Sequence, residues 1–319
     1  MKNFVPNLIF FCVFSWGIAD CLSAQSTVTI YGLRGSSGVA MLELFERPPQ
    51  HPGVNIRVEA LAQADLMAVR FIRGEAQIGI LPPNVAARIA ADGRRIQVAA
   101  VIGNGMLSLL TSDNNVRRIE DLRGRTIEVA GQGATPDYVF RRILLSRHLN
   151  PDRDVRLSYS LAPPEIAQSL IAGRVSTALL PEPFATMARL GRPSLRDVSD
   201  IQSDWITAGG IENYPMTVVV VNADFAAANP ALLRTILNAF ERSVNMVRAN
   251  PQSAGALAER HDLGLRANIV SASIPRSNYV FIPASAARPA LEALFGTFLE
   301  FSPVSIGGRL PDDSFYLSW

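Results

Sequence analysis

Cysteine is almost absent from this chain. The 319 residues contain two, Cys12 and Cys21, and both lie within residues 1–24. In that segment Lys2 precedes an apolar run at residues 8–18, and small residues follow before Gln25, as in a secretory signal peptide. Cleavage after residue 24 leaves a mature chain without thiols, which excludes disulfides and cysteine nucleophiles.

Cys21 permits an alternative to soluble export. Residues 18–21 loosely resemble a bacterial lipoprotein signal, in which the cysteine is lipidated, but Asp20 departs from the small residue usually found there. We expect soluble export to the periplasm, with a lipid anchor at Cys21 as the alternative.

Histidine is also scarce, with only His51, His148 and His261. No two of them have a metal-ligand spacing, and neither HExxH nor CxxC occurs, so we expect no metal and no cofactor. Thirty Lys and Arg against 28 Asp and Glu give a net charge of +2, which offers no broad footprint for nucleic acid. After the first two dozen residues, no apolar run is long enough to cross a membrane.

The length of 319 residues and the 48% hydrophobic content predict a folded protein of two lobes. Strands are expected at residues 27–33, 55–61, 77–81 and 96–102, with helices between them, which favours an α/β fold around a largely parallel sheet. Helices are expected at residues 229–250, 251–261 and 284–301, packed against the first lobe.

The central motif is residues 131–138, where a strand at residues 126–130 turns abruptly into a helix. Gly131 and Gly133 allow unusual backbone angles, Thr135 is expected to cap the helix, and Pro136 fits its first position. The free N–H groups of such a helix start attract an anion or a ligand acceptor atom. An ordinary strand-to-helix turn is the alternative.

Similar polar loops follow other expected strands. Ser36 and Ser37 follow the first strand, where either could cap a helix or offer a hydroxyl to a ligand, and Asn84 is expected to cap the helix after residues 77–81. Asn104, between two glycines, is either a turn residue or a side chain directed at a cleft. Ligands of open α/β sheets bind outside the carboxyl ends of the strands, where these loops lie.

A weak repeat supports two lobes built on one plan. Residues 73–84 align without gaps on residues 172–183, with matches such as Gly74 to Gly173 and Pro82 to Pro181. Apolar extended segments at residues 107–112 and 215–222 are expected to cross between the lobes. Glu182 follows the repeated strand, where it would accept from a ligand N–H or cap the next helix.

The chain as a whole resembles the periplasmic substrate-binding proteins of ABC importers, in the nitrate, sulfonate, taurine and thiamine-precursor branch. The motifs that carry the resemblance are residues 34–38, 103–105, 133–138 and 180–184. It implies a type II periplasmic-binding fold, with lobe 1 formed by residues 25–112 and 220–319 and lobe 2 by residues 113–219. Two crossing strands would join these lobes.

The resemblance further implies a monomer that closes on a small-molecule ligand and delivers it to an ABC permease, with no enzymatic activity. An enzyme of the same fold is one rival, but the related fungal thiamine-pyrimidine synthases and porphobilinogen deaminase rely on cysteine. An exported sensor is another. The candidate ligand contacts are Arg34, Ser36, Ser37, Asn84, Asn104, Gly133, Ala134, Thr135, Glu182 and Tyr214.

The residues point to two ligand types. The helix starts and Arg34 favour an anionic or acceptor-rich ligand such as a sulfonate, carboxylate or nitrate. Glu182 would repel a small anion and favours N–H donors, while Tyr31, Trp205 and Tyr214 could stack on a planar ring. The interpretation preferred from sequence is a nitrogen heterocycle of the thiamine-precursor kind, with a small anion as the alternative.

Overall fold

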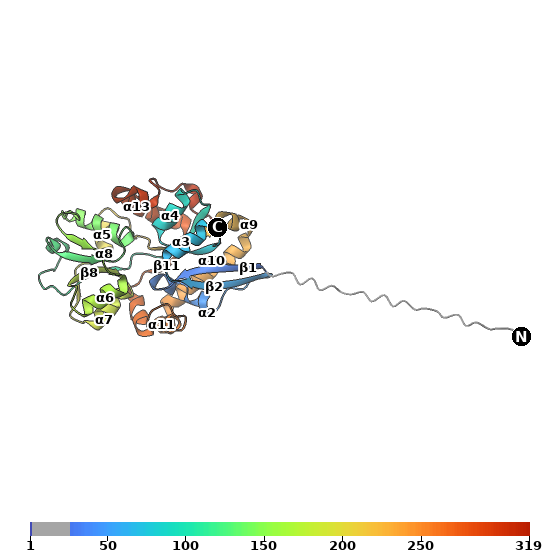
Figure 1. Cartoon of the computed structure of the whole chain (residues 1–319), viewed down its shortest axis with the longest axis horizontal. Helices are drawn as coiled ribbons and strands as arrows, with labels where there is room; N and C mark the ends of the chain where they lie inside the picture. The colour runs from blue at the N-terminus through green and yellow to red at the C-terminus, as the bar shows by residue number, and fades with distance from the viewer. Residues whose placement is uncertain (2–25) are drawn as a thin grey trace.

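The computed structural model describes Met1 and residues 26–319, so the expected signal peptide, with Cys12 and Cys21, lies outside the described residues. The chain forms two lobes, each built around one sheet and covered by helices (Figure 1). The expected α/β class and two-lobed architecture are confirmed.

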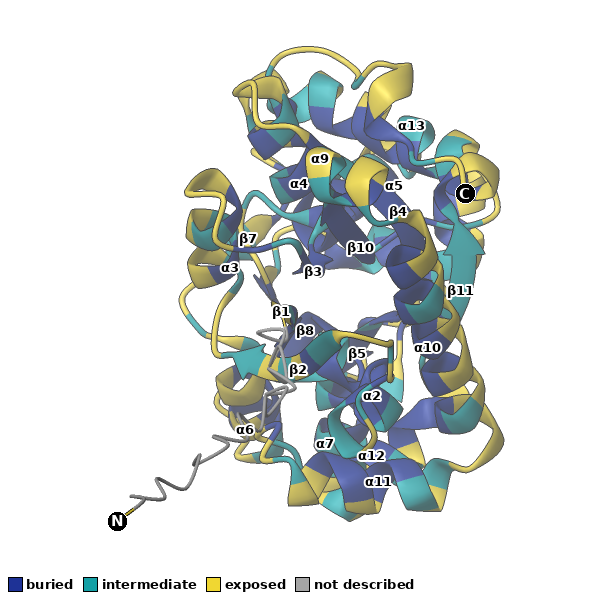
Figure 2. Ribbon diagram, turned by 90° about the vertical axis from the view of Figure 1, so that its right-hand side faces the viewer, coloured by how far each residue is buried: buried dark blue, intermediate teal, exposed yellow. Residues whose placement is uncertain are grey.

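The first sheet has six strands in the order β2-β1-β3-β10-β4-β11. Its strands are β1 (Ser26–Leu33), β2 (Val54–Leu61), β3 (Ile78–Leu81), β4 (Ile96–Gly103), β10 (Thr217–Asn222) and β11 (Tyr279–Pro283). β1 pairs in parallel with β2 and β3, whereas β10 runs antiparallel to both of its neighbours. β10 lies between two strands and is covered on both faces, which explains its unbroken run of valines (Figure 2).

The second sheet has five strands in the order β7-β6-β8-β5-β9. They are β5 (Leu107–Thr111), β6 (Thr126–Val129), β7 (Arg156–Ser158), β8 (Thr177–Pro181) and β9 (Arg196–Asp197). β6 pairs in parallel with β7 and β8, and β5 runs antiparallel to β8. The order β7-β6-β8-β5 repeats the order β2-β1-β3-β10 of the first sheet.

The sequence repeat therefore corresponds to a structural repeat. Helix α3 (Ala64–Ile72) and helix α6 (Pro163–Ile171) occupy positions 99 residues apart, as do the starts of β3 and β8. Each of the two strands leads into a further helix, α4 (Pro83–Ala91) or α7 (Phe184–Gly191). The prediction that both lobes share one plan is confirmed by this common order of strands.

The chain crosses between the sheets at residues 104–106 and 208–216. β5 hydrogen-bonds to β8 and β10 to β3, so the strand before residue 112 belongs to the second sheet and the strand from residue 217 to the first. Sheet membership therefore differs by a few residues from the expected boundaries at 112/113 and 219/220. The crossing segments are shorter than the apolar runs because most of each run is a strand within one sheet.

The remaining helices cover the two sheets. In lobe 2 they are α5 (Thr135–Ser146) and α8 (Ile201–Thr207); in lobe 1 they are α1 (Ser36–Val39), α2 (Leu42–Glu46), α9 (Ala223–Ala228), α10 (Pro230–Ala249), α11 (Pro251–Arg260), α12 (Ala267–Ser273) and α13 (Ala284–Phe301). Short 3₁₀ turns span Ile119–Leu122, Ile274–Arg276, Pro303–Ile306 and Asp313–Phe315. The three long helices expected in the C-terminal third are confirmed, and α10 and α13 pack on the first sheet.

Helix α13 also reaches the second lobe. Tyr138 of α5 packs edge-on against Phe298 and parallel to Phe301, with ring centroids 4.9 and 5.8 Å away. Arg142 of α5 donates to the carbonyl of Ala208 and lies 3.0 Å from the carboxylate of Glu300. α13 therefore provides a third connection between the lobes beside the two crossing segments.

The C-terminal segment is fixed to the first sheet. The N–H of Leu317 donates to the carbonyl of Val98, and Nε1 of Trp319 donates to the carbonyl of Ala99 at 3.2 Å. The end of the chain thus continues the sheet edge beside β4. Across the described residues, no helix combines the length and apolar character needed to span a bilayer.

Candidate functional site

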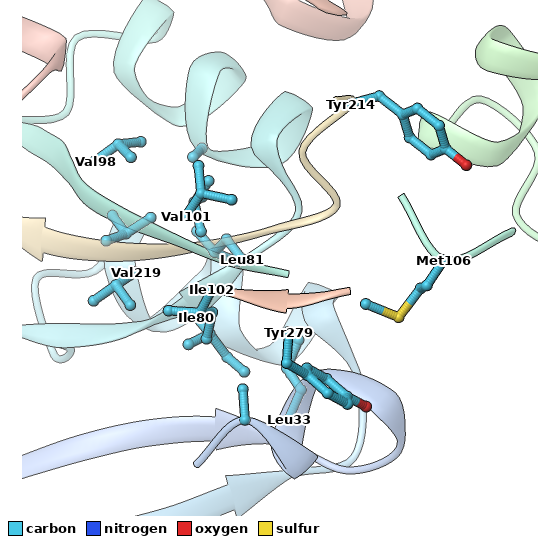
Figure 3. Packing of buried hydrophobic residues seen from close by; sticks show 14 of the residues in the cluster. Leu33, Ile80, Leu81, Val98, Val101, Ile102, Met106, Tyr214, Val219 and Tyr279 are labelled. Carbon is cyan, nitrogen blue, oxygen red and sulfur yellow. The ribbon is translucent and has the colours of Figure 1, made fainter. Parts of the chain in front are cut away.

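The loops that leave the first sheet meet at one edge, because the register of the strands brings their ends together. Tyr31 of β1 lies beside Gly79, Val218 beside Leu81, and both Thr217 and Tyr279 lie beside Gly103. Figure 3 shows Met106 and Tyr214 beyond the strand ends and Tyr279 at the start of β11, with aliphatic side chains of the sheet, such as Val98 and Val219, farther from this edge. This edge faces the segment that crosses to lobe 2.

Ser36 and Ser37 lie at this edge, but the prediction that one of them caps a helix is wrong. The N-cap of α1 is Gly35, whose φ of 82° is available to glycine, and within residues 26–319 α1 has no side-chain cap. Oγ of Ser37 instead lies 3.2 Å from Oγ1 of Thr217, and the hydroxyl of Tyr279 donates to the carbonyl of Ser36 at 3.0 Å. Burial raises the pKa of Tyr279, which keeps this hydroxyl protonated as a donor.

Asn84 and Asn104 are both buried at the same edge. Pro82 is the N-cap of α4, so the expected capping by Asn84 is wrong. Asn84 is an early helical residue, and its buried Oδ1 has no hydrogen-bond partner among the described residues. Asn104 is 2% exposed, and its backbone N–H donates to the carbonyl of Asn278 at 2.9 Å. Asn104 therefore links the first crossing segment to the start of β11.

In lobe 2 the central motif begins a helix as expected, with a different residue as the cap. Ala134 is the N-cap of α5, Thr135 is the first helical residue and Pro136 the second. Capping by Thr135 is wrong because Ala134 holds the N-cap position, and among the described residues no side chain caps α5. Oδ2 of Asp137, in the first turn, instead accepts from the N–H of Gly133 at 2.9 Å. Oγ1 of Thr135 is left buried, without a partner in the described part of the chain.

The carboxylate of Asp137 is neutralised within the protein. It accepts from Nε of Arg141 at 2.8 Å and from the hydroxyl of Tyr159 at 2.6 Å. Burial, together with this bond to Asp137, raises the pKa of Tyr159. The start of α5 therefore keeps its neutral Thr135 hydroxyl for another partner, while the acidic group behind it is already paired.

Glu182 is fully engaged by its own lobe. It is 1% exposed; one carboxylate oxygen accepts from the N–H of Thr186 and the other from Nη1 of Arg189, each at 2.9 Å. Glu182 was expected either to accept from a ligand N–H or to cap the next helix. The structure supports the second role, because Glu182 binds a backbone N–H in the first turn of α7. Thr186 also has a buried hydroxyl for which the described residues supply no partner.

Three aromatic side chains expected to stack on a ligand are buried in the core. Tyr214 is 1% exposed and packs edge-on against Trp205, with ring centroids 5.6 Å apart. Burial raises the pKa of Tyr214. The guanidinium of Arg70 lies over the ring of Tyr31, 4.9 Å from the ring centroid. None of these rings offers a free face, because the sheets and helices pack closely around them.

Arg34 lies at the rim. Its guanidinium lies 3.3 Å from the carboxylate of Asp262, and both side chains are at least half exposed. The neighbouring Gly35 N–H donates to the carbonyl of Leu263 at 2.9 Å, which fixes the loop after β1 to the loop after α11. Arg34 is therefore still accessible to solvent.

An inter-lobe cavity of about 420 Å³ adjoins these loops. Its lobe 2 wall comes from α6 and α7 and its lobe 1 wall from the segment after Leu263; it is lined by Pro164, Gln168, Ile171, Phe184, Met187, Leu190, Gly191, Gly264, Leu265, Arg266 and Ile269. Phe184 starts the helix that Glu182 precedes, and Gly264 follows the residue bonded to Gly35. The cavity is lined largely by apolar side chains from both lobes.

The arrangement of polar groups in the two lobes suits the binding of a small ligand. Asn84 in lobe 1 and Thr135 in lobe 2 each place a buried polar oxygen in the first turn of a helix that follows a parallel strand. Buried polar atoms almost always have a partner, so these two mark places for a ligand or water. Within the described residues, no group of three His, Cys, Asp or Glu side chains is placed to hold a metal.

Sequence reasoning missed Thr217, Tyr279 and Thr186. Thr217 is the one polar residue at the start of the apolar strand β10, which is a detectable pattern. The position of Tyr279 opposite Gly103 depends on long-range pairing, and the sequence carries no signal for it.

Solved structures share this two-lobed fold, which is that of periplasmic binding proteins. An ABC transporter protein from Parabacteroides distasonis is 25% identical with a TM-score of 0.77, covering 92% of this chain and 99% of its own. The periplasmic aliphatic sulphonate binding protein SsuA from Escherichia coli is 17% identical with a TM-score of 0.73, covering 92% of both chains. The periplasmic nitrate-binding protein NrtA from Synechocystis PCC 6803 is 11% identical with a TM-score of 0.58, covering 77% of this chain and 69% of its own.

Residues 73–261 match the model of the NMT1-like family, and the chain belongs to this family. This match spans both lobes and both crossing segments. No curated protein sequence matches the chain.

Proposed function

We propose that this chain is the extracytoplasmic substrate-binding component of an ABC import system, which closes on a small molecule and delivers it to a membrane permease. The observation that carries the proposal is the pair of buried, unpartnered oxygens on Asn84 and Thr135, one in each lobe. Family membership and the likeness to binding proteins of ABC transporters support it. We further propose a periplasmic, monomeric protein without enzymatic activity.

The mechanism follows from the two crossing segments. A ligand that contacts both lobes binds the closed form better than the open form, so it shifts the population towards closure. Asn84 and Ser37 would contact it from lobe 1 and Thr135 from lobe 2. The closed shape would then be recognised by the permease.

The ligand is proposed to be a small, acceptor-rich molecule of the sulfonate or carboxylate type. Helix starts and the hydroxyls of Ser37, Thr135 and Thr217 offer donors, and Arg34 provides an accessible cation at the rim. The alternative, a nitrogen heterocycle of the thiamine-precursor kind, depended on a free Glu182 and on stacking by Tyr214. Both side chains are engaged within the protein.

A thermal-shift panel tests the ligand class. The mature protein is titrated with ethanesulfonate, taurine, nitrate, acetate, thiamine and an aminopyrimidine, and hits are confirmed by calorimetry. A ligand at a hundred times its dissociation constant should add about 2.7 kcal/mol to the free energy of unfolding. Stabilisation by the pyrimidine alone would contradict the sulfonate proposal, and no stabilisation by any of them would contradict binding of these classes.

Paired variants test the site itself. Thr135→Val should weaken binding of the confirmed ligand at least tenfold and leave the melting temperature nearly unchanged, because the hydroxyl has no partner to lose. Thr207→Val, on the exposed surface of α8, is the matched control and should bind normally. Equal affinity in both variants would place the ligand elsewhere. An exported sensor would bind the same ligand, but deleting its gene would leave uptake of that ligand unchanged.

A further inference from the structure

Helix α3 exposes an apolar stripe. Leu66, Val69 and Ile72 are 51%, 42% and 40% exposed, and their spacing of three residues places them on one face of the helix. The opposite face carries Met67 and Phe71, which are buried against the first sheet. Among the residues that the structure describes, no other helix exposes three large apolar side chains.

The internal repeat shows that the fold does not require this stripe. Helix α6 occupies the equivalent position in lobe 2, where Glu165 and Gln168 stand 99 residues after Leu66 and Val69. Both are exposed polar residues. The first two positions of the stripe are therefore polar in lobe 2, whereas Ile72 corresponds to Ile171, an apolar residue in the wall of the inter-lobe cavity. Leu66 and Val69 are thus apolar and exposed at positions where the repeated fold accepts polar residues.

The stripe lies close to the ligand cleft. α3 begins at Ala64, three residues after β2 ends at Leu61, so its first turn stands at the carboxyl edge of the first sheet. The Arg34 N–H donates to the carbonyl of Leu61 at 2.8 Å, which ties the loop before α3 to the loop after β1. Figure 1 shows α3 on the side of lobe 1 that lies towards lobe 2, and Figure 2 shows it at the left edge of the molecule.

We propose that the α3 stripe, defined as Leu66, Val69 and Ile72, docks on the extracytoplasmic surface of the membrane permease; this rests on the proposed function. Exposed apolar patches rimmed by charge mark interaction sites, and Asp65, Arg70 and Arg73 surround this one. Three partly exposed side chains fall far short of the ~800 Å² per partner buried in a stable interface, which argues against a permanent dimer. A transient contact beside the cleft fits a delivery step.

Site-specific photo-cross-linking tests this surface. A benzophenone amino acid replaces Val69, its repeat counterpart Gln168, or the exposed Leu190 of lobe 2 in the full-length precursor, expressed in cells of the source organism. Illumination should join Val69 to a polytopic membrane protein that mass spectrometry identifies as an ABC permease, at a yield at least tenfold above that from Gln168.

A second variant separates contact from folding. With the photoreactive residue at Leu66, Val69→Asp should reduce the permease adduct at least tenfold and leave the melting temperature and the affinity for the ligand found in the panel unchanged. Leu145→Asp, at an exposed apolar position of α5 outside the cavity, is the matched control and should keep the adduct.

The other outcomes each contradict the proposal. An adduct between Val69 and a second copy of the chain would assign the stripe to self-association. A permease adduct from Leu190 but not from Val69 would overturn the α3 surface and leave the proposed function intact. Absence of a permease adduct from both positions, together with a negative ligand panel, would overturn both.

Discussion

Oγ of Ser37 lies 3.2 Å from Oγ1 of Thr217, although 180 residues separate them in the chain. This contact joins the short helix α1, which follows the first strand, to the point where the chain returns from lobe 2. Thr217 is also the first residue of β10, which pairs with β3 and β4. The hydroxyl pair thus connects the proposed ligand loop to the segment that must bend when the lobes move.

A double-mutant cycle tests this connection. Ser37→Ala and Thr217→Val should each lower the free energy of unfolding, with a coupling of about 1 kcal/mol, because each removes the partner of the other. Both should also weaken ligand binding. Thr111 and Thr177, whose hydroxyls are 2.8 Å apart inside the second sheet, form the matched control pair.

In the control pair, Thr111→Val and Thr177→Val should couple in stability without changing ligand affinity. Urea unfolding and calorimetry measure the two quantities. Equal losses of affinity in both pairs would mean that the effect is one of general stability and that the Ser37 contact has no special place near the ligand.

Glu182→Gln should destabilise lobe 2 by about 2 kcal/mol, because it removes the buried carboxylate that pairs with Arg189, which keeps Asp197 as its remaining carboxylate partner. Ligand affinity, measured well below the melting temperature, should stay within about twofold. Glu241→Gln on the exposed face of α10 is the control and should change neither quantity. A selective loss of affinity in Glu182→Gln would show that the carboxylate contacts the ligand and would restore the heterocycle proposal.

The secondary structure and the repeat could be predicted because they depend on local patterns. Apolar periodicity, Gly74 and Gly173 after helices, and Pro230 at a helix start all leave signals in nearby residues. The helix caps could not be predicted, because Ala134, which has no capping group, holds the N-cap position of α5 in place of Thr135. Only the backbone geometry places it there.

Site residues depend on contacts that local patterns do not record. Glu182 is paired by Arg189, seven residues later on the next helix, and Tyr214 is enclosed by Trp205 and by Gly105 of the first crossing segment. The same limit explains the lobe boundaries. The apolar runs of β5 and β10 look alike in sequence, and long-range pairing alone assigns each to its sheet.

Arg142→Ala should loosen the contact between α13 and lobe 2. Its guanidinium donates to the carbonyl of Ala208 at 2.9 Å and pairs with Glu300, so we expect a loss of about 2 kcal/mol. Small-angle scattering of the ligand-free protein should show a larger radius of gyration. Arg248→Ala at the exposed end of α10 is the control; if its radius rises equally, the Arg142 contact does not restrain the lobes.

Acid should destabilise the loop at residues 150–154. The backbone N–H of Asn150, and then Arg153, lower the pKa of Asp154 from its ordinary value of 3.8 to about 2. A lowered folded-state pKa means that the stabilisation is present above the ordinary value and is lost as pH falls towards about 2. In Asp154→Asn, the midpoint of urea unfolding should therefore change less with pH between about pH 4 and pH 2 than it does in the unmodified protein.

The matched control for Asp154→Asn is Asp65→Asn on the exposed face of α3, which should keep the acid slope of the unmodified protein. An unchanged slope in Asp154→Asn would show that the bonds to Asn150 and Arg153 do not persist in solution.

Reductant and chelator should leave the melting temperature of residues 25–319 unchanged. Both cysteines precede residue 25, and the described residues hold no cluster of three potential metal ligands. Differential scanning calorimetry of residues 25–319, with and without dithiothreitol or EDTA, measures this. A fall of several degrees with EDTA would reveal a metal site that the described residues do not suggest.

The position of β10 has a consequence for the order of assembly. All strands of the second sheet come from one continuous stretch, Leu107–Asp197, whereas the first sheet has a vacant place between β3 and β4 until Thr217–Asn222 arrive. As the chain emerges from its N-terminus, lobe 2 can complete its hydrogen bonding first, and lobe 1 must wait with two unpaired strand edges. A factor that shields those edges while the chain folds would therefore act on lobe 1, whose first sheet is the last to be completed.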